Sequence, residues 1–401
     1  MLKKIKLFYL FLFILPIVAP ISTPLEYFIL AQIFLVLIYL TLAYGYNNKI
    51  RKYTNCKKPC NDVPVKNILR FIGLTTPFLA VYAAYYYTGS LPFDVMLNFI
   101  IDKSNYQSYQ DYFKEQDLQL FSLDKIPAIL SLVAIKFTLV AFAIYYSNLK
   151  LKTIKDIIIM IIIIISHIYI SLARGTSLEL FELLVLFYFI QAPENKNKIF
   201  LLIYRRISIL ILVGVFSFVF IYNIETRGEI GCVTSDMCYK EGVITKLIGE
   251  SDKILYGLVG YFSFGLFYTH SAAGIILSDI TQTLGSLFPF VLPEIFEEKR
   301  LSAVVCSQMD CGAAWQPDII TYIYNYGLIL TFFGIFYCGK FIAKLHLEYQ
   351  SDYLIWSKSA QFMIFLLIIS LPFGNIVSSS SSNILSLILF LTLRFIKNQR
   401  E

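Results

Sequence analysis

Apolar runs of about 20 residues recur along most of the chain, and no other feature constrains its fold as strongly. A helix of that length crosses the hydrocarbon core of a bilayer, which is about 30 Å thick. Hydrophobic residues make up 57% of the chain and charged residues only 15%, whereas soluble proteins carry about a quarter charged residues. The composition excludes a soluble domain and predicts an all-α polytopic membrane protein.

Ten apolar segments are predicted to be transmembrane helices. They are 7–21, 25–44, 67–88, 126–147, 157–173, 176–192, a segment that ends at 222, 322–343, 359–373 and 383–395. Basic residues precede the first segment and follow the last, so the positive-inside rule places both termini in the cytoplasm. Most other Lys and Arg residues fall in predicted cytoplasmic loops. The net charge of +7 therefore follows from membrane topology and requires no nucleic-acid partner.

A large extracytoplasmic loop is expected between the seventh and eighth spans. It divides the chain into an N-terminal membrane scaffold (1–222), the loop (223–320) and a C-terminal membrane region (321–401). The apolar stretch Ile254–Leu277 inside the loop contains glycines, tyrosines and a histidine, which favours short interfacial or re-entrant helices. A full span there would place the basic C-terminus outside the cell. A smaller outer loop, 89–125, carries more acidic than basic residues.

The large loop contains four of the seven cysteines, in two close pairs: Cys232 with Cys238 and Cys306 with Cys311. Local disulfides persist in an oxidising compartment, which agrees with a periplasmic loop. Four free thiols are the alternative. Cys56 and Cys60 lie in a basic cytoplasmic loop without a second pair of ligands, so the sequence predicts no metal site.

Two Arg-Gly pairs are expected at the outer membrane face. Arg174 and Gly175 form the turn between two spans, and Arg227 follows the seventh span. A guanidinium can bind a diphosphate in a two-pronged way, and glycine permits a tight turn and the close approach of a ligand. The alternatives are a snorkelling arginine at position 174 and a surface ion pair at position 227, where Glu225 is one flanking carboxylate.

Several other side chains are candidates for chemistry or for structure. His270 is the only histidine in an outer loop and is either an acid–base group or an interfacial histidine. Trp315 can stack on a sugar ring or mark the membrane interface. Lys136 and His167 lie within spans, where a buried polar residue is a functional candidate, although structural bridges between helices are the favoured interpretation. No nucleotide-binding motif is present.

These features together resemble O-antigen polymerases of the Wzy type and oligosaccharide repeat-unit polymerases, over most of the chain. The resemblance rests on the spacing of the spans, on both Arg-Gly pairs and on the end of the large loop. The motifs are Ala173-Arg-Gly-Thr176, Arg227-Gly228, Trp315-Gln-Pro-Asp318 and Tyr324-Asn-Tyr-Gly327.

The resemblance implies a metal-independent, inverting glycosyltransferase without a cofactor, in the inner membrane with its large loop in the periplasm. Its donor would be a growing glycan on undecaprenyl pyrophosphate and its acceptor one repeat unit on the same carrier. Arg174 and Arg227 would bind pyrophosphate, and His270 or a loop carboxylate such as Glu225 would orient or deprotonate the acceptor. The bilayer and a chain-length regulator protein are the further partners implied.

Two other functions remain open. An O-antigen ligase shares this scaffold and hands the glycan to a different acceptor. A lipid-linked oligosaccharide flippase or other transporter would differ more, because transporters usually contain repeated halves and helices broken near the membrane midplane. The sequence shows no internal repeat and few ionisable residues within its spans, which favours the polymerase.

Overall fold

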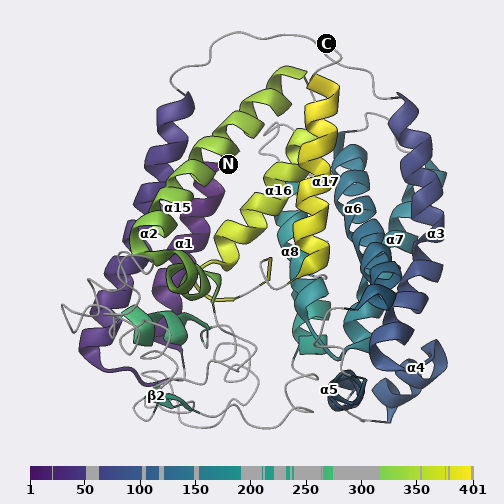
Figure 1. The fold of residues 1–401 in the computed structure, drawn as a ribbon, viewed down its shortest axis with the longest axis horizontal. Helices are drawn as coiled ribbons and strands as arrows, with labels where there is room; N and C mark the ends of the chain where they lie inside the picture. Colours follow the sequence, from purple (N-terminus) through teal and green to yellow (C-terminus); the bar gives the residue numbers. More distant parts are fainter. Residues whose placement is uncertain are drawn as a thin grey trace. The chain divides into compact units, whose positions relative to one another are not determined.

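The computed structural model covers the 401-residue chain and is described for residues 1–19, 21–50, 63–101, 105–116, 122–148, 153–190, 210, 213–220, 232–234, 237–238, 263, 265–273, 317–352, 355–374, 376–377 and 380–398. Its helices are α1 (Leu2–Val18), α2 (Leu25–Ile50), α3 (Val63–Thr88), α4 (Pro92–Ile100), α5 (Asn105–Glu115), the 3-10 helix η1 (Leu123–Lys125), α6 (Ile126–Asn148), α7 (Ile154–Ala173), α8 (Leu178–Ile190), α15 (Asp318–Asp352), α16 (Ile355–Ser370) and α17 (Ser381–Asn398). Figure 1 shows this helical architecture.

Among the described helices, five are long and apolar enough to cross a membrane. They cover Leu25–Asn48, Lys66–Thr88, Leu123–Ser147, Ile154–Ala173 and Asn325–Tyr349, and two shorter apolar helices are Ile355–Ser370 and Ser381–Ile396. Large apolar side chains such as Phe71 and Phe78 are exposed on their outer faces, as expected where lipid is the solvent. This architecture is that of a multi-pass membrane protein. The count of ten spans and the cytoplasmic location of both termini stay predictions.

The chain divides into two compact units, each built from early and late parts of the sequence. Unit 1 comprises Met1–Cys56, Ile230–Gln350 and Ile364–Ser379, and unit 2 comprises Lys57–Glu229, Ser351–Met363 and Ser380–Glu401. The division at residues 222 and 320 was drawn from predicted membrane topology and stays a prediction. The two units are described in turn.

The core of unit 2 is formed by α3, α6 and α7, which lie side by side, and α17 packs against α6. Small residues allow close helix contacts. A Cβ atom added to Gly73 of α3 would lie 2.8 Å from Ile159 of α7, and Ala80 packs in one buried cluster with Ile135 and Ile170. These contacts fix α7, whose end carries the Arg-Gly turn.

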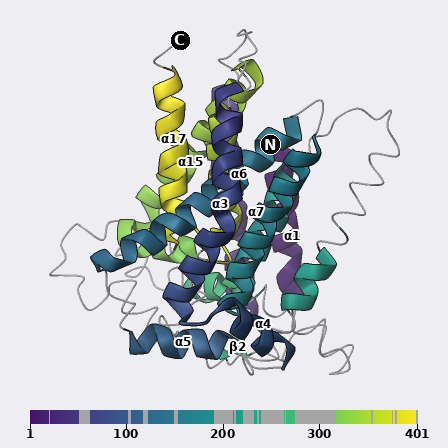
Figure 2. The ribbon, with the colours of Figure 1, turned by 90° about the vertical axis from the view of Figure 1, so that its right-hand side faces the viewer.

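The outer loop 89–125 contains two helices that the sequence analysis did not identify. Both α4 and α5 lie at the end of unit 2 where α3 and α7 end (Figure 2). The Asn105 side-chain amide donates to the carbonyl of Leu172 at 3.2 Å and to that of Val95 at 3.3 Å. Leu172 lies two residues before the Arg-Gly turn. The loop and the turn, both predicted to be extracytoplasmic, therefore lie at one end of this unit.

The opposite end of α7 carries a second charged group. Arg70 of α3 donates to the Asp156 carboxylate at 2.6 Å, and Lys66 lies 3.9 Å from the same group. Thr153 caps α7 by accepting from the backbone N–H of Asp156, which satisfies a donor that the helix leaves unpaired. This end of α7 therefore carries a partly buried arginine–carboxylate pair.

In unit 1, α2 and α15 approach closely through glycines. A Cβ atom added to Gly45 would lie 2.1 Å from the Phe336 carbonyl oxygen, and one on Gly339 would lie 2.3 Å from that of Leu42. The start of α15 is joined to the turn after α16, because Asp318 N–H donates to the Gly374 carbonyl at 2.9 Å. Gly327 interrupts α15 with φ 77° and ψ 167°, a conformation that is essentially restricted to glycine.

A short antiparallel hairpin joins β1 (Cys232–Thr234) and β2 (Met237–Cys238), and Cys232 and Cys238 are opposed in its register. Directly opposed residues in such a ladder have Cα atoms about 4.5–5.5 Å apart, within the range that a disulfide spans. The backbone is therefore compatible with the predicted local pairing. Cys306 and Cys311 lie outside the described residues, and the disulfides stay predictions.

Candidate functional site

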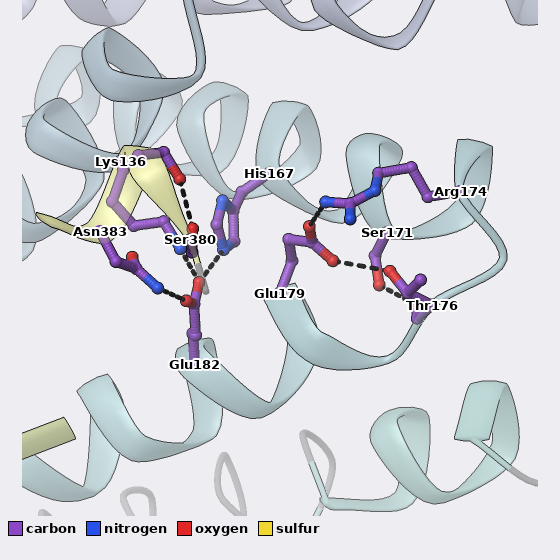
Figure 3. Close-up of polar contacts among 10 residues, drawn as sticks. Lys136, His167, Ser171, Arg174, Thr176, Glu179, Glu182, Ser380 and Asn383 are labelled. Atoms are coloured by element: carbon purple, nitrogen blue, oxygen red, sulfur yellow. Dashed lines mark hydrogen bonds and ion pairs between the residues drawn. The ribbon is translucent and has the colours of Figure 1, made fainter. Parts of the chain in front are cut away.

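Unit 2 contains a group of buried polar side chains centred on Glu182, shown in Figure 3. We call Lys136, His167, Glu182 and Asn383 the Glu182 cluster. They come from α6, α7, α8 and α17, and the side chains of Lys136, His167 and Glu182 are 8%, 2% and 3% exposed. Four helices therefore converge on one carboxylate.

The two oxygens of the Glu182 carboxylate have different partners. The Asn383 side-chain amide donates to Oε1 at 2.7 Å, and the Lys136 ammonium forms an ion pair with Oε2. His167 Nε2 lies 3.4 Å from Oε2 without forming a hydrogen bond. Lys136 and His167 both contact Glu182 of α8, so each links its own helix to α8, as the bridging interpretation expects, and a functional role for either residue stays a prediction.

A second acidic residue of α8, Glu179, binds the Arg-Gly turn. Arg174 Nη1 donates to Glu179 Oε1 at 3.0 Å, and the Thr176 hydroxyl donates to Oε2 at 3.0 Å. The Ser171 hydroxyl donates to the Thr176 carbonyl. Glu179 and Glu182 are three residues apart, so they project from the same face of the helix, as Figure 3 shows. One face of α8 therefore links the turn to the buried cluster.

The Arg174 guanidinium lies at the C-terminal end of α7, and 26% of the Arg174 side chain is exposed. It lies over the Tyr109 ring of α5 at 5.3 Å from the centroid, a cation–π arrangement. Burial alone would lower the pKa of Arg174, but the Glu179 carboxylate and Tyr109 raise it above its ordinary value. Arg174 is therefore a fixed positive charge that is paired to Glu179, and a snorkelling role remains the alternative to ligand binding.

Gly175 has φ +56°, and a Cβ atom there would lie 2.4 Å from the Tyr106 backbone nitrogen. The turn therefore requires glycine for two reasons: its left-handed conformation and its contact with α5. The tight turn expected from the sequence is confirmed. The space beside Gly175 is filled by α5, and a role for this glycine in ligand binding stays a prediction.

His270 belongs to unit 1, within the helical residues 265–273, and is fully buried. Its ring lies edge-on to Phe28 at 5.9 Å and to Phe267 at 5.2 Å. Within the described part of the chain, neither ring nitrogen has a hydrogen-bond partner. Burial lowers the pKa of His270 to about 3, so its imidazole is neutral near pH 7. An acid–base role for this histidine stays a prediction.

The structure brings together some of the predicted site residues and leaves others outside its description. Arg174 and Gly175 are adjacent in unit 2, and His270 is in unit 1. Glu225, Arg227 and Trp315 lie outside the described residues. Comparisons with protein-family models, with curated proteins and with solved structures found no match.

Sequence reasoning missed Glu179, Glu182 and Asn383 as site residues. The available signal was the presence of two glutamates three residues apart in a predicted span, since carboxylates in a span are costly unless they are paired. Lys136 and His167 were noted in spans, and a search for their counter-ions would have found Glu182. Asn383 gave no comparable signal, because an asparagine at the start of a helix is common.

Proposed function

We propose that this chain is a polysaccharide polymerase of the inner membrane, a metal-independent inverting glycosyltransferase that joins oligosaccharide repeat units carried on undecaprenyl pyrophosphate. The reaction would occur at the periplasmic face, where the Arg174 turn and the large loop are predicted to lie. A growing glycan leaves its pyrophosphate carrier and is transferred to a hydroxyl of the incoming repeat unit.

The observation that carries this proposal is the state of Arg174. Its guanidinium is permanently charged, partly exposed and oriented by Glu179 and Tyr109 at the end of a membrane-length helix. A guanidinium has five N–H donors, so these contacts leave donors for phosphate oxygens. A fixed cation at the membrane boundary suits a leaving group that combines a lipid tail with a pyrophosphate, because it stabilises the negative charge that develops.

The other predicted roles come from the sequence alone. Arg227 would supply a second positive charge for pyrophosphate, and Trp315 would stack on a sugar. His270 or Glu225 would orient or deprotonate the acceptor hydroxyl. His270 is neutral near pH 7, as a base must be, but a hydroxyl would reach it only if the residues that bury it moved apart.

The test replaces Arg174 and follows the length of the polysaccharide. Arg174→Ala and Arg174→Lys are expressed in cells that lack their own copy of the gene, and glycan ladders are resolved on gels. We expect Arg174→Ala to lower polymerisation by about 100-fold, as for loss of one oxyanion-stabilising donor. Arg174→Lys keeps the charge but loses the forked geometry, so we expect it to restore only short chains. Normal ladders from Arg174→Ala would reject the proposal.

Arg70→Ala is a matched control at the other end of α7. Arg70 is 24% exposed and paired to Asp156, which closely matches Arg174 with its 26% exposure and its pairing to Glu179. Loss of Arg70 should cost similar stability and leave the ladder intact. If both variants lose long chains equally and both are depleted from the membrane, the effect of Arg174 is on folding.

The gene-deletion phenotype separates the polymerase from a ligase. Loss of a polymerase should leave the lipid A core bearing a single repeat unit, whereas loss of a ligase should leave bare core. This comparison requires no assumption about any one residue.

A proton-coupled transporter of lipid-linked sugars is a second candidate, and one observation favours it. Lys136, His167 and Glu182 form a buried ionisable group inside membrane helices, the kind of group that marks proton and substrate pathways in transporters. Reconstituted vesicles would distinguish the two functions. A transporter should move lipid-linked oligosaccharide between leaflets and respond to a proton gradient, whereas a polymerase should lengthen the glycan without either effect.

A further inference from the structure

The Glu182 cluster contains more ionisable groups than a structural bridge requires. The Lys136 ammonium and the Glu182 carboxylate already balance each other's charge, and Asn383 satisfies the other carboxylate oxygen. His167 adds a third titratable group that is 2% exposed. Among side chains, histidine is the one whose ordinary pKa allows its charge to change between pH 5 and 8.

The position of His167 Nε2 suggests what the ring does. This nitrogen faces the Glu182 carboxylate at 3.4 Å and has no hydrogen-bond partner among the residues that the structure describes. A proton on Nε2 would turn an unsatisfied contact into a charge-assisted hydrogen bond, which is both shorter and stronger than a neutral one. In the described part of the chain, the imidazole therefore directs a nitrogen without a hydrogen bond at a carboxylate.

The charged and polar groups around the His167 ring have opposing effects on its proton affinity. Removal of the buried ring from water opposes a positive imidazole most strongly, and Lys136 of α6 opposes it further, whereas the Glu182 carboxylate of α8, 3.4 Å from Nε2, favours it. On α17, Asn383 is neutral and donates to the far oxygen of Glu182. On α7 itself, Arg174 is already paired to Glu179, and α3 presents Thr76, which accepts from Ser166 at 3.2 Å. Burial, Lys136 and Glu182 together set the proton affinity of His167, and the two charges are the part that a substitution can change.

We propose that the Glu182 cluster is a reversible proton-binding site within the membrane part of unit 2, with His167 as the acceptor. His167 Nε2 takes a proton that originates in water and donates it as a hydrogen bond to Glu182 Oε2, so the cluster passes from net charge zero to plus one. No other bond forms or breaks. This site does not depend on whether the chain polymerises or transports glycans.

The chain contains only three histidines, His167, His270 and His346, so ring protonation can be followed one residue at a time. The full chain is labelled with ring-¹⁵N histidine, placed in lipid nanodiscs and titrated by NMR from pH 9 to pH 5. His270→Phe and His346→Gln assign the signals. We expect the His167 signals to change reversibly from neutral imidazole to imidazolium, because the Glu182 carboxylate beside Nε2 offsets the effect of burial. His270 is equally buried but lies against aromatic rings, and with its pKa of about 3 it should stay neutral throughout.

Charge variants test whether the cluster sets the proton affinity. Glu182→Gln should lower the His167 midpoint by about one pH unit or more, and Lys136→Met should raise it similarly, each a tenfold change in proton affinity. The double variant Lys136→Met/Glu182→Gln removes both charges together and should lie between the two. If a single variant fails to fold, the double variant still tests whether the two charges influence the His167 midpoint.

Two outcomes would overturn the proposal. One is a wild-type His167 that keeps a single protonation state from pH 9 to pH 5, which would leave a purely structural bridge. The other is a His167 midpoint in the double variant and in every folded single variant that equals the wild-type value, because the neighbouring charges would then have no influence. The wild-type titration decides the first point without any variant.

Discussion

The two units bury titratable side chains in opposite ways. In unit 2, Lys136 and Glu182 are buried as an ion pair, with Asn383 completing the carboxylate. In unit 1, His270 is buried among aromatic rings without a hydrogen bond to its nitrogens in the described part of the chain, and burial lowers its pKa to about 3. A charge inside a protein must be paired or removed, and this chain uses both solutions.

The two solutions differ in how they respond to change. A buried pair is sensitive to the loss of one partner, because the remaining charge has no compensation. A neutral ring held by packing is sensitive mainly to shape and volume. The experiments below use this difference.

The largest effect is expected from Lys136→Met. It removes the only ammonium beside Glu182 in the described structure and should destabilise the protein by about 3–5 kcal/mol, as when a buried ion pair loses one member. Thermal unfolding of the purified protein in a single detergent would measure the loss.

The double variant Lys136→Met/Glu182→Gln is the control for that experiment. Because it removes both charges, it should recover most of the loss, and the coupling between the two positions should exceed about 1 kcal/mol. Additive losses would indicate that the two side chains do not interact, contrary to their contact in the structure.

A smaller effect is expected from Gly175→Ala, about 1–3 kcal/mol, because alanine would be strained at φ +56° and would meet the Tyr106 backbone. Gly334→Ala in α15 is the matched control in unit 1. A Cβ atom at Gly334 has no neighbouring atom within 4 Å, and alanine favours a helix over glycine, so this variant should be neutral or slightly stabilised. Equal losses at both positions would contradict the described turn. Unfolding midpoints in the same detergent compare the two.

The helices followed from the sequence because bilayer thickness sets their length and the apolar runs are long. The predicted segment 126–147 and α6, for example, differ by only one residue. The helices α4 and α5 did not follow, because the loop 89–125 contains too few apolar residues to suggest membrane insertion. Each has an amphipathic face, with buried Val95 on α4 and buried Tyr109 on α5, and the other face is polar or exposed.

The candidate site was only partly predictable for a similar reason. Arg174-Gly175 was identified because an arginine between two spans is costly unless it is paired or faces water, and because the glycine beside it permits a tight turn. Its partner Glu179 was not identified, because a carboxylate in the first turn of a helix is ordinary. Only the packing of α7 beside α8 shows that this carboxylate pairs with Arg174. His270 was identified by its rarity, but its burial depends on Phe28, which is 242 residues away in the sequence.

The pH dependence of stability should separate the two regions further. The folded-state pKa of His270 is about 3 and its ordinary value is 6.5, so below pH 6.5 the unfolded chain binds a proton that the folded chain does not. The contribution of neutral His270 is complete above pH 6.5 and is lost as the pH falls toward 3. Between pH 6.5 and 5.5 the loss should be about 1 kcal/mol.

Unfolding free energies of wild type and His270→Phe, measured at pH 7.5, 6.5 and 5.5, isolate this contribution. Titration of other groups, including His167, is common to both proteins and cancels in the difference. The unfolding free energy of His270→Phe should rise relative to that of the wild type as the pH falls. A gap that stays constant would mean that His270 is protonated equally in both states.

The smallest effect on stability is expected from His270→Phe at neutral pH, within about 1 kcal/mol of wild type. Phenylalanine keeps a ring against Phe28 and Phe267. It removes two nitrogens that have no hydrogen bond to the described residues, a change that can be nearly neutral. The variant therefore separates the packing of the ring from its chemistry.

If His270 is the proposed acid–base group, polymerisation by His270→Phe should fall sharply while the unfolding midpoint stays unchanged. The adjacent Thr269→Val is the matched control: it loses a 2.6 Å hydrogen bond to the Pro372 carbonyl, so it should cost about 1 kcal/mol and leave polymerisation intact. A folded, fully active His270→Phe would remove this histidine from the reaction, and a loss of several kcal/mol would show that its nitrogens have partners that matter to the fold.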